Sequence, residues 1–184
     1  MQIQRVNVSP MELVTLSALK EHMRIEHDAE DSLLKSLQRA AYDWVEQFTY
    51  RSLLTTQWKF SSLPLKGGSE IRLALPFPNL LEIEEVFHAF TASNKERVRK
   101  FSVQLKNGIP YLCLLSKGVP IEVAYSAGFG PHPDFVPEAF HHVIKVLVAH
   151  WYEHREGANC GIPDTVELFL RPYQIRRLDS VVTR

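Results

Sequence analysis

The sequence predicts an α+β fold in which a helical framework is interrupted by an antiparallel β meander. Two stretches, about 28–49 and 137–155, carry apolar residues at the 3.6-residue period of an amphipathic helix. Between them, apolar and polar residues alternate over about 55–126, a pattern that is typical of half-buried strands. Turn signals separate these strand-like runs without an intervening helix, so the βαβ spacing of a parallel sheet is absent from the sequence.

The first long helix is predicted over about 28–49, after a short helix that Ser17 can cap and that runs to about His22. Asp28 is expected to cap the long helix, because an aspartate side chain accepts hydrogen bonds from the first free N–H groups. The expected buried face consists of Leu33, Leu34, Leu37, Ala40, Ala41, Trp44, Val45 and Phe48. The expected exposed face consists of Lys35, Gln38, Arg39, Asp43 and Glu46.

The middle of the chain is expected to form five or six short strands. Trp58 and Phe60 alternate with polar residues, and the same holds for Ile71 and Leu73. The dipeptide 107–108 is Asn-Gly, and both residues tolerate positive φ. We therefore predict a tight hairpin at this dipeptide.

The last part of the chain returns to the helical period. Pro137 is expected to start the second long helix, which runs to about residue 155. A short C-terminal helix is predicted over about 163–170. The expected stripe of the long helix consists of Phe140, Val143, Ile144, Leu147, Val148 and Trp151. The two long helices must pack on each other, because neither can bury its stripe alone.

These elements predict a single domain over residues 1–184. Its helical core comprises 12–54 and 127–172, and the β insertion comprises 55–126. Residues 173–184 are expected to form a flexible basic tail.

The composition excludes several classes of protein. The chain has 184 residues, of which 45% are hydrophobic, so it is too apolar to be disordered. It has 21 basic and 21 acidic residues, and this zero net charge argues against a general nucleic-acid binder. A neutral surface gives little mutual repulsion, which favours assembly. No signal peptide or membrane-spanning run is found, so we expect an intracellular site of synthesis and no membrane partner.

His150, Glu153 and His154 match the H-x-x-E-H pattern of a zinc-dependent hydrolase. Two histidines at i and i+4 can bind one zinc ion, and a nearby glutamate can activate a bound water. The alternative is an aromatic and histidine-rich helix end, which we favour because so short a match is common by chance. Only 30 residues follow to supply a third ligand. We therefore assign no catalytic residue, no metal site and no cofactor.

A third alternative is a nucleic-acid or peptide-binding module that uses the β face and the basic tail. The tail region carries Arg171, Arg176, Arg177 and Arg184, which could contact phosphates or an acidic partner. A solvated chain end explains the same residues equally well.

Several segments, taken in order, resemble a known family. They are Leu16–Phe48, Tyr125-Ser126-Ala127-Gly128-Phe129-Gly130, Val136-Pro137, Trp151-Tyr152-Glu153-His154-Arg155-Glu156, and Ile162-Pro163 through Leu170-Arg171-Pro172-Tyr173. This series resembles the head–tail connector (adaptor) family of tailed phages, prophages and gene transfer agents, of the gene-product-six type. The resemblance is to the longer subgroup with a β insertion. The family pattern leaves position 154 variable, so it further weakens the zinc interpretation.

The resemblance implies a structural virion protein without enzymatic activity at the head–tail junction. It implies a homo-oligomeric ring of about twelve copies, because a connector would match the symmetry of the portal protein. The ring would bind the portal protein on one side and a tail or stopper protein on the other. DNA would pass through it without sequence-specific contacts, along a polar surface that is not strongly basic.

The resemblance also suggests which surfaces make contacts. Candidate lateral contacts are the polar faces of the long helices: Lys35, Arg39, Asp43, Glu46, Glu138, His142 and Lys145. Arg171, Arg176 and Arg177 are candidates for an arm that docks on the portal protein.

Overall fold

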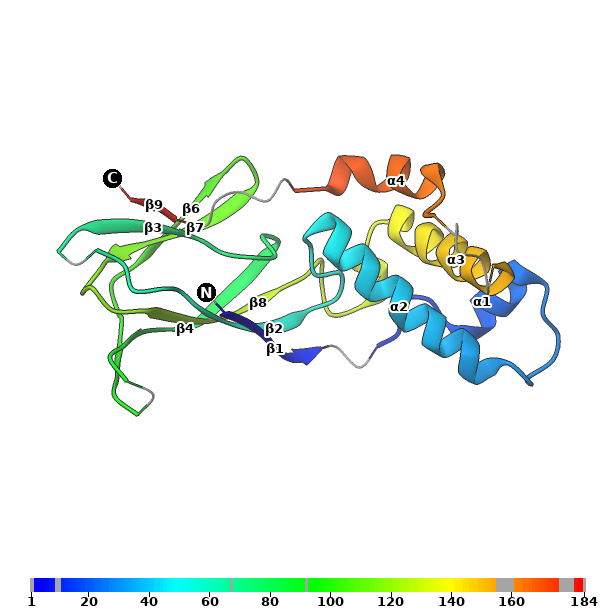
Figure 1. The fold of residues 1–184 in the computed structure, drawn as a ribbon, viewed down its shortest axis with the longest axis horizontal. Coiled ribbons are helices and arrows are strands. Elements are labelled where there is room, and N and C mark those ends of the chain that lie inside the picture. The colour runs from blue at the N-terminus through cyan, green and yellow to red at the C-terminus, as the bar shows by residue number, and fades with distance from the viewer. Residues whose placement is uncertain are drawn as a thin grey trace. The chain divides into compact units, whose positions relative to one another are not determined.

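The computed structural model describes residues 2–8, 11–66, 68–91, 93–154, 161–175 and 181–183 (Figure 1). The chain divides into two compact units. The helical unit comprises Pro10–Thr49 and Gly130–Ile175, and the β unit comprises Met1–Ser9, Tyr50–Phe129 and Arg176–Arg184. The expected β insertion did not include either end of the chain, whereas the β unit takes in both. That the two units act as one connector domain stays a prediction.

The helical unit contains α1 (Leu16–Met23), α2 (Asp31–Thr49), α3 (Glu138–Glu153) and α4 (Asp164–Leu170). Two short 3-10 helices, η1 (Pro133–Phe135) and η2 (Arg171–Tyr173), lie on either side of α3 and α4 in the chain. Helix α3 packs against α2, as expected, and also against α1 and α4. The α+β fold class and all predicted helices are confirmed, with boundaries shifted by a few residues.

The N-terminal caps differ from the sequence-based expectation. Helix α1 is capped by Thr15, whose hydroxyl oxygen accepts a hydrogen bond from the Ala18 N–H at 3.2 Å. Helix α2 begins at Asp31 and not at Asp28. The Asp28 carboxylate instead pairs with the Lys20 ammonium at 2.5 Å, and Asp31 pairs with the same ammonium at 2.7 Å. The Lys20 charge holds the pKa of Asp28 below its usual range.

The buried face of α2 is centred differently from the predicted one. Leu34, Ala41 and Val45 are buried as expected, but Ala40 is exposed. Gln38 and Glu46, both expected on the exposed face, are buried. The Gln38 side-chain amide donates a hydrogen bond to the backbone oxygen of Val14, which satisfies a polar group inside the helical unit.

Helix α3 follows its predicted pattern closely. Five of the six stripe residues are buried and Trp151 is half-buried: the buried ones are Phe140, Val143, Ile144, Leu147 and Val148. In α4 only Val166 and Leu170 are buried, whereas Leu168 and Phe169 are exposed. The seven-residue helix therefore buries one side against α3.

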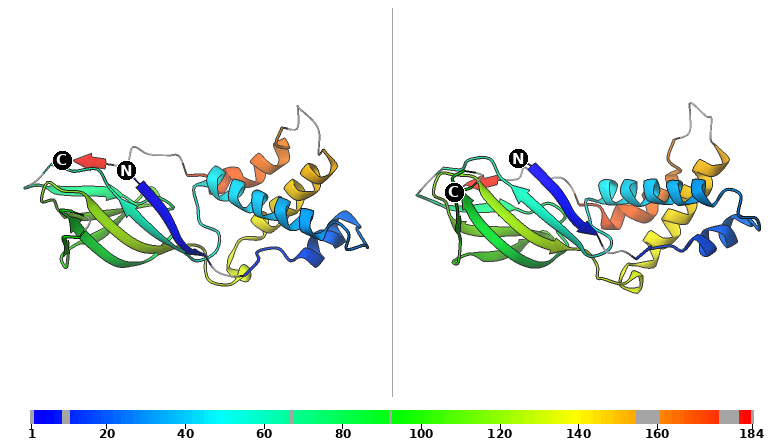
Figure 2. Two further views of the ribbon diagram at one scale, coloured as in Figure 1. Left: turned by 60° about the horizontal axis from the view of Figure 1, so that its bottom comes forward. Right: turned by 90° about the horizontal axis from the view of Figure 1, so that it is seen from below.

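The β unit consists of two antiparallel sheets (Figure 2). The five-stranded sheet has the order β1-β2-β8-β4-β5, and the four-stranded sheet has the order β6-β7-β3-β9. The strands are β1 (Gln2–Val8), β2 (Thr56–Ser61), β3 (Glu70–Ala74), β4 (Leu80–Ala89), β5 (Lys95–Arg97), β6 (Ser102–Lys106), β7 (Ile109–Leu115), β8 (Ile121–Ala127) and β9 (Val181–Thr183). The antiparallel pairing was predicted, but the meander is wrong in detail, because β8 lies between β2 and β4.

One apolar core lies between the two sheets. It includes Trp58, Phe60 and Tyr125 from the larger sheet and Ile71 and Leu73 from the smaller one. The predicted hairpin between β6 and β7 is confirmed, with φ of 52° at Asn107 and 76° at Gly108. These positive values are those of the tight hairpin turn for which Asn-Gly is suited.

Two strands were missed by the sequence analysis. Strand β1 pairs with β2 at one edge of the larger sheet, and β9 pairs with β3 at one edge of the smaller sheet (Figure 2). Strand β9 lies within residues 173–184, where only a flexible tail was expected. Its three residues are too few for a periodic signal, and their partner in β3 is more than 100 residues away.

Candidate functional site

The Tyr-Ser-Ala-Gly-Phe-Gly motif closes the end of β8. The Tyr125 side chain is fully buried, and its hydroxyl donates a hydrogen bond to the Pro76 carbonyl oxygen at 2.6 Å. Burial raises the pKa of Tyr125 well above its usual range, so the hydroxyl remains a neutral donor. Gly128 follows with φ of 153°, and its N–H donates to the backbone oxygen of Asn79 at 2.9 Å. The motif therefore makes structural contacts at the end of β8.

The candidate contact residues of α2 form one exposed stripe. Lys35, Arg39 and Asp43 are spaced four residues apart and are all exposed. Glu46, proposed with them, is an incorrect assignment, because its exposed fraction is 1%. It lies three residues before the buried Thr49, so it belongs to the packed side of the last turns of the helix.

The candidate residues of α3 also share a stripe. Glu138 and His142 are exposed, and Lys145 is half-buried. The His142 ring meets the exposed Phe169 ring of α4 edge-on, with the ring centroids 5.2 Å apart. This contact joins the polar stripe of α3 to an exposed aromatic residue of α4, a neighbour that the sequence pattern did not indicate.

The basic arm can be placed only in part. Arg171 is exposed at the start of η2. Arg176, Arg177 and Arg184 lie outside the described residues. The backbone just before them is anchored, since the Ile175 N–H donates to the Thr49 carbonyl oxygen at 3.2 Å.

The zinc motif gains no support from the geometry. His150 Nε2 lies 2.9 Å from the Gly161 carbonyl oxygen, and His154 Nδ1 lies 2.9 Å from the His150 carbonyl oxygen. Each of these nitrogens therefore donates its proton to a carbonyl oxygen, so only the other ring nitrogen of each histidine could bind a metal ion. Glu153 is exposed. Across the described ranges, no group of three or more His, Cys, Asp or Glu side chains is arranged to hold a metal ion.

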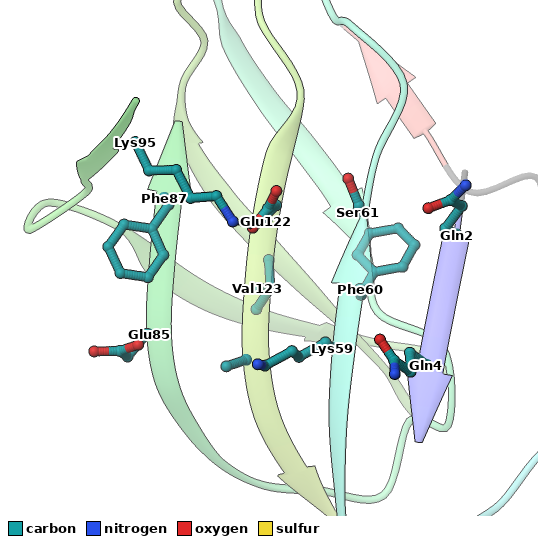
Figure 3. Close-up of a pocket in the computed structure, with 11 residues that line it drawn as sticks. Gln2, Gln4, Lys59, Phe60, Ser61, Glu85, Phe87, Lys95, Glu122 and Val123 are labelled. Carbon is teal, nitrogen blue, oxygen red and sulfur yellow. Dashed lines mark hydrogen bonds and ion pairs between the residues drawn. The ribbon is translucent and has the colours of Figure 1, made fainter. Parts of the chain in front are cut away.

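A polar hollow, which the sequence analysis did not predict, lies on the outer face of the five-stranded sheet (Figure 3). All five strands contribute to its lining: Gln2, Gln4, Lys59, Phe60, Ser61, Glu85, Phe87, Lys95, Glu122, Val123 and Ala124. Across its floor the Lys95 ammonium pairs with the Glu122 carboxylate at 2.6 Å. The alternation of outward polar residues along β2 and β8 was the available signal, but the sheet order needed to join them was not readable.

The structure is thus an α+β fold in which most of the candidate residues of α2 and α3 lie on exposed polar faces. Residues 13–78 match the family model described as "Phage gp6-like head-tail connector protein". Over these residues the match bears out the resemblance to the head–tail connector family that the sequence indicated. No curated protein sequence matches the chain significantly.

Solved structures show the same fold over almost the whole chain. A chain of the neck of an empty gene transfer agent particle, with C6 symmetry, is 20% identical and gives a TM-score of 0.79. Chains of the virion and of the C12-symmetric neck of native gene transfer agent particles are each 19% identical, with TM-scores of 0.80 and 0.70. Each match covers 97% of both chains.

Among the described helices, none is long and apolar enough to cross a membrane.

Proposed function

We propose that this chain is a structural head–tail connector, a virion component that forms a ring between the portal protein and a tail or stopper protein. The observation that carries the proposal is the match of residues 13–78 to the head–tail connector family model. In this role the protein is made in the bacterial cytoplasm and assembles at the head–tail junction. It extends the DNA channel and catalyses no reaction.

The structural relatives support a ring. They are chains of necks of gene transfer agent particles with C6 and C12 symmetry, and their fold covers 97% of this chain. A ring of about twelve copies needs two unlike surfaces on each copy, which meet head-to-tail and close. The zero net charge of the chain suits copies that pack side by side around passing DNA without binding it tightly.

Two surfaces of the helical unit are candidates for the contacts between neighbouring copies in the ring. The stripe of Lys35, Arg39 and Asp43 and the stripe of Glu138, His142 and Lys145 both combine opposite charges. Mixed charges of this kind fix the register of a contact and disfavour wrong partners. The basic arm of Arg171, Arg176 and Arg177 is proposed to dock on the portal protein.

The test is assembly of the purified chain with the portal protein encoded beside it. We expect rings of one size by electron microscopy and mass photometry, either alone at high concentration or on the portal. A portal from an unrelated phage is the control and should bind no rings. A chain that stays monomeric at millimolar concentration and does not bind its own portal contradicts the proposal.

A further inference from the structure

At one edge of the smaller sheet, apolar side chains on the core-facing side of the sheet are exposed in the described structure. Strand β6 is an edge strand, and all five of its residues are exposed. Val103 lies opposite the buried Leu112, so the two side chains point to the same face of the sheet. Nevertheless Val103 is 43% exposed and Leu105 is 73% exposed. Together with the exposed Phe101 they form an uncovered apolar strip.

Three cations flank this strip. Arg99, Lys100 and Lys106 are exposed, and none of them makes an ion pair with any residue that the structure describes. The nearby Lys95 and Lys117, by contrast, are paired with Glu122 and Glu96. We call Arg99–Lys106 the basic edge. It combines positive charge with apolar side chains on a chain of zero net charge.

A second open edge of the β unit has the opposite charge. Strand β5 pairs only with residues 87–89 of β4, so residues 80–85 have a strand partner on one side only, among the described residues. Glu82, Glu84 and Glu85 are exposed there, beside Leu81, which is 49% exposed. We call Leu81–Glu85 the acidic edge. Its register with β8 shifts twice, which leaves Leu81 and Glu84 as extra residues.

The two edges are complementary in chemistry. Each presents apolar side chains beside like charges, three positive on one edge and three negative on the other. The shifts in β4 disrupt the regular spacing that a further strand would need, so contact through side chains is favoured over addition of a strand. Arg97, which lies just before the basic edge in the chain, is 4.0 Å from the Glu85 carboxylate of the acidic edge.

We infer that the basic edge of one copy docks on the acidic edge of a second copy, as a lateral contact in addition to the helix stripes. This inference rests on the proposed ring, since head-to-tail closure requires two different surfaces on each copy. The docked pair would cover Val103 and Leu105 and would neutralise both sets of charges. The basic edge also exposes apolar residues. Protein–DNA interfaces are more polar than protein–protein interfaces, so these residues favour a protein over DNA as the binding partner of this edge.

The test uses two variants of the full chain, each with three charge reversals. Variant A carries Arg99→Glu, Lys100→Glu and Lys106→Glu, and variant B carries Glu82→Lys, Glu84→Lys and Glu85→Lys. Each variant alone should self-associate at least roughly tenfold more weakly than the natural chain, because like charges then face each other. An equimolar mixture should assemble again, since the two variants have complementary edges when they alternate. Sedimentation velocity and electron microscopy measure both effects.

Controls and contrary outcomes separate the possible failures. The variant Lys66→Glu changes one exposed cation outside both edges and outside the polar hollow, and it should assemble like the natural chain. Circular dichroism checks that each variant folds, and Glu82→Lys alone replaces variant B if the triple change does not. Normal assembly of variant A, or a mixture that fails to assemble, overturns the inference while leaving the proposed ring intact. Unchanged assembly of variant A with loss of duplex-DNA binding also overturns it and assigns the basic edge to DNA. Absence of natural rings, with or without portal, overturns the proposed function itself.

Discussion

Gly128 is the residue where the end of β8 lies directly against the backbone that leads into β2. A Cβ atom built at this position would lie 2.7 Å from the carbonyl carbon and oxygen of Leu54 and from the nitrogen of Thr55. Backbone atoms on both sides are held by hydrogen bonds, because the Phe129 N–H donates to the Leu53 carbonyl oxygen at 3.0 Å. Only glycine fits this close approach.

Replacement of this glycine should be costly. We expect Gly128→Ala to lower the free energy of unfolding by about 3 kcal/mol or more, because the added methyl group meets backbone that cannot move aside. Urea denaturation followed by tryptophan fluorescence measures the change. Gly108→Ala is the matched control, since Gly108 has φ of 76° but open space around it. Its cost should be about 1 kcal/mol, from backbone strain alone. Equal costs for the two variants would contradict the role of close approach.

At the residue scale, the sequence identified the motif but not the reasons for it. The Tyr-Ser-Ala-Gly-Phe-Gly pattern was recognised as a family feature, yet the partner of Tyr125, the Pro76 carbonyl, is 49 residues away. Likewise Gln38 was assigned to the exposed face, because a burial that depends on the Val14 carbonyl cannot be read from helical periodicity. Polar residues are placed by specific distant partners, whereas apolar residues follow the local period.

At the element scale, the start of α1 offers a direct comparison of two possible caps. Ser17 was the sequence-based choice, but the structure places the cap at Thr15. Thr15→Ala should destabilise the helical unit by about 1 kcal/mol, since an unsatisfied N–H group remains in the first turn. Ser17→Ala, on an exposed position inside the helix, should have little effect or a slightly favourable one. Hydrogen exchange of the α1 amides checks both, and a larger effect at Ser17 would reverse the assignment.

The helices were predictable at this scale and the sheet order was not. Helix α3 matches its apolar stripe at five of six positions, because a helix buries one continuous face. The alternation along β2 and β8 predicted strands, but nothing in either segment shows that they are neighbours. Pairing between distant strands depends on the whole core. The acidic edge, the basic edge and the polar hollow therefore became visible only in three dimensions.

At the scale of the whole molecule, both end segments of the chain belong to the β unit. Strand β9 pairs with Ile71 and Leu73 of β3, and both of those side chains are fully buried in the core. A chain that stops at Ser180 should therefore lose about 1–2 kcal/mol of unfolding free energy, because β3 becomes an unprotected edge. Thermal and urea denaturation test this, and Arg184→Ala, which keeps residues 181–183, is the control. Equal stability of the shortened chain would show that β9 does not contribute to the fold.

The division of the chain into units also has a consequence for its synthesis. The chain passes between the two units four times, because each unit is assembled from separated segments. A ribosome that has made residues 1–129 has supplied eight of the nine described strands but only the first two described α-helices. Helix α2 then lacks its packing partner α3, and its apolar face is available to chaperones or to other nascent chains. Because many contacts join segments that are far apart in the sequence, we expect folding to be completed slowly. The yield of assembly-competent subunits should therefore depend on the last third of translation, which supplies α3 and α4.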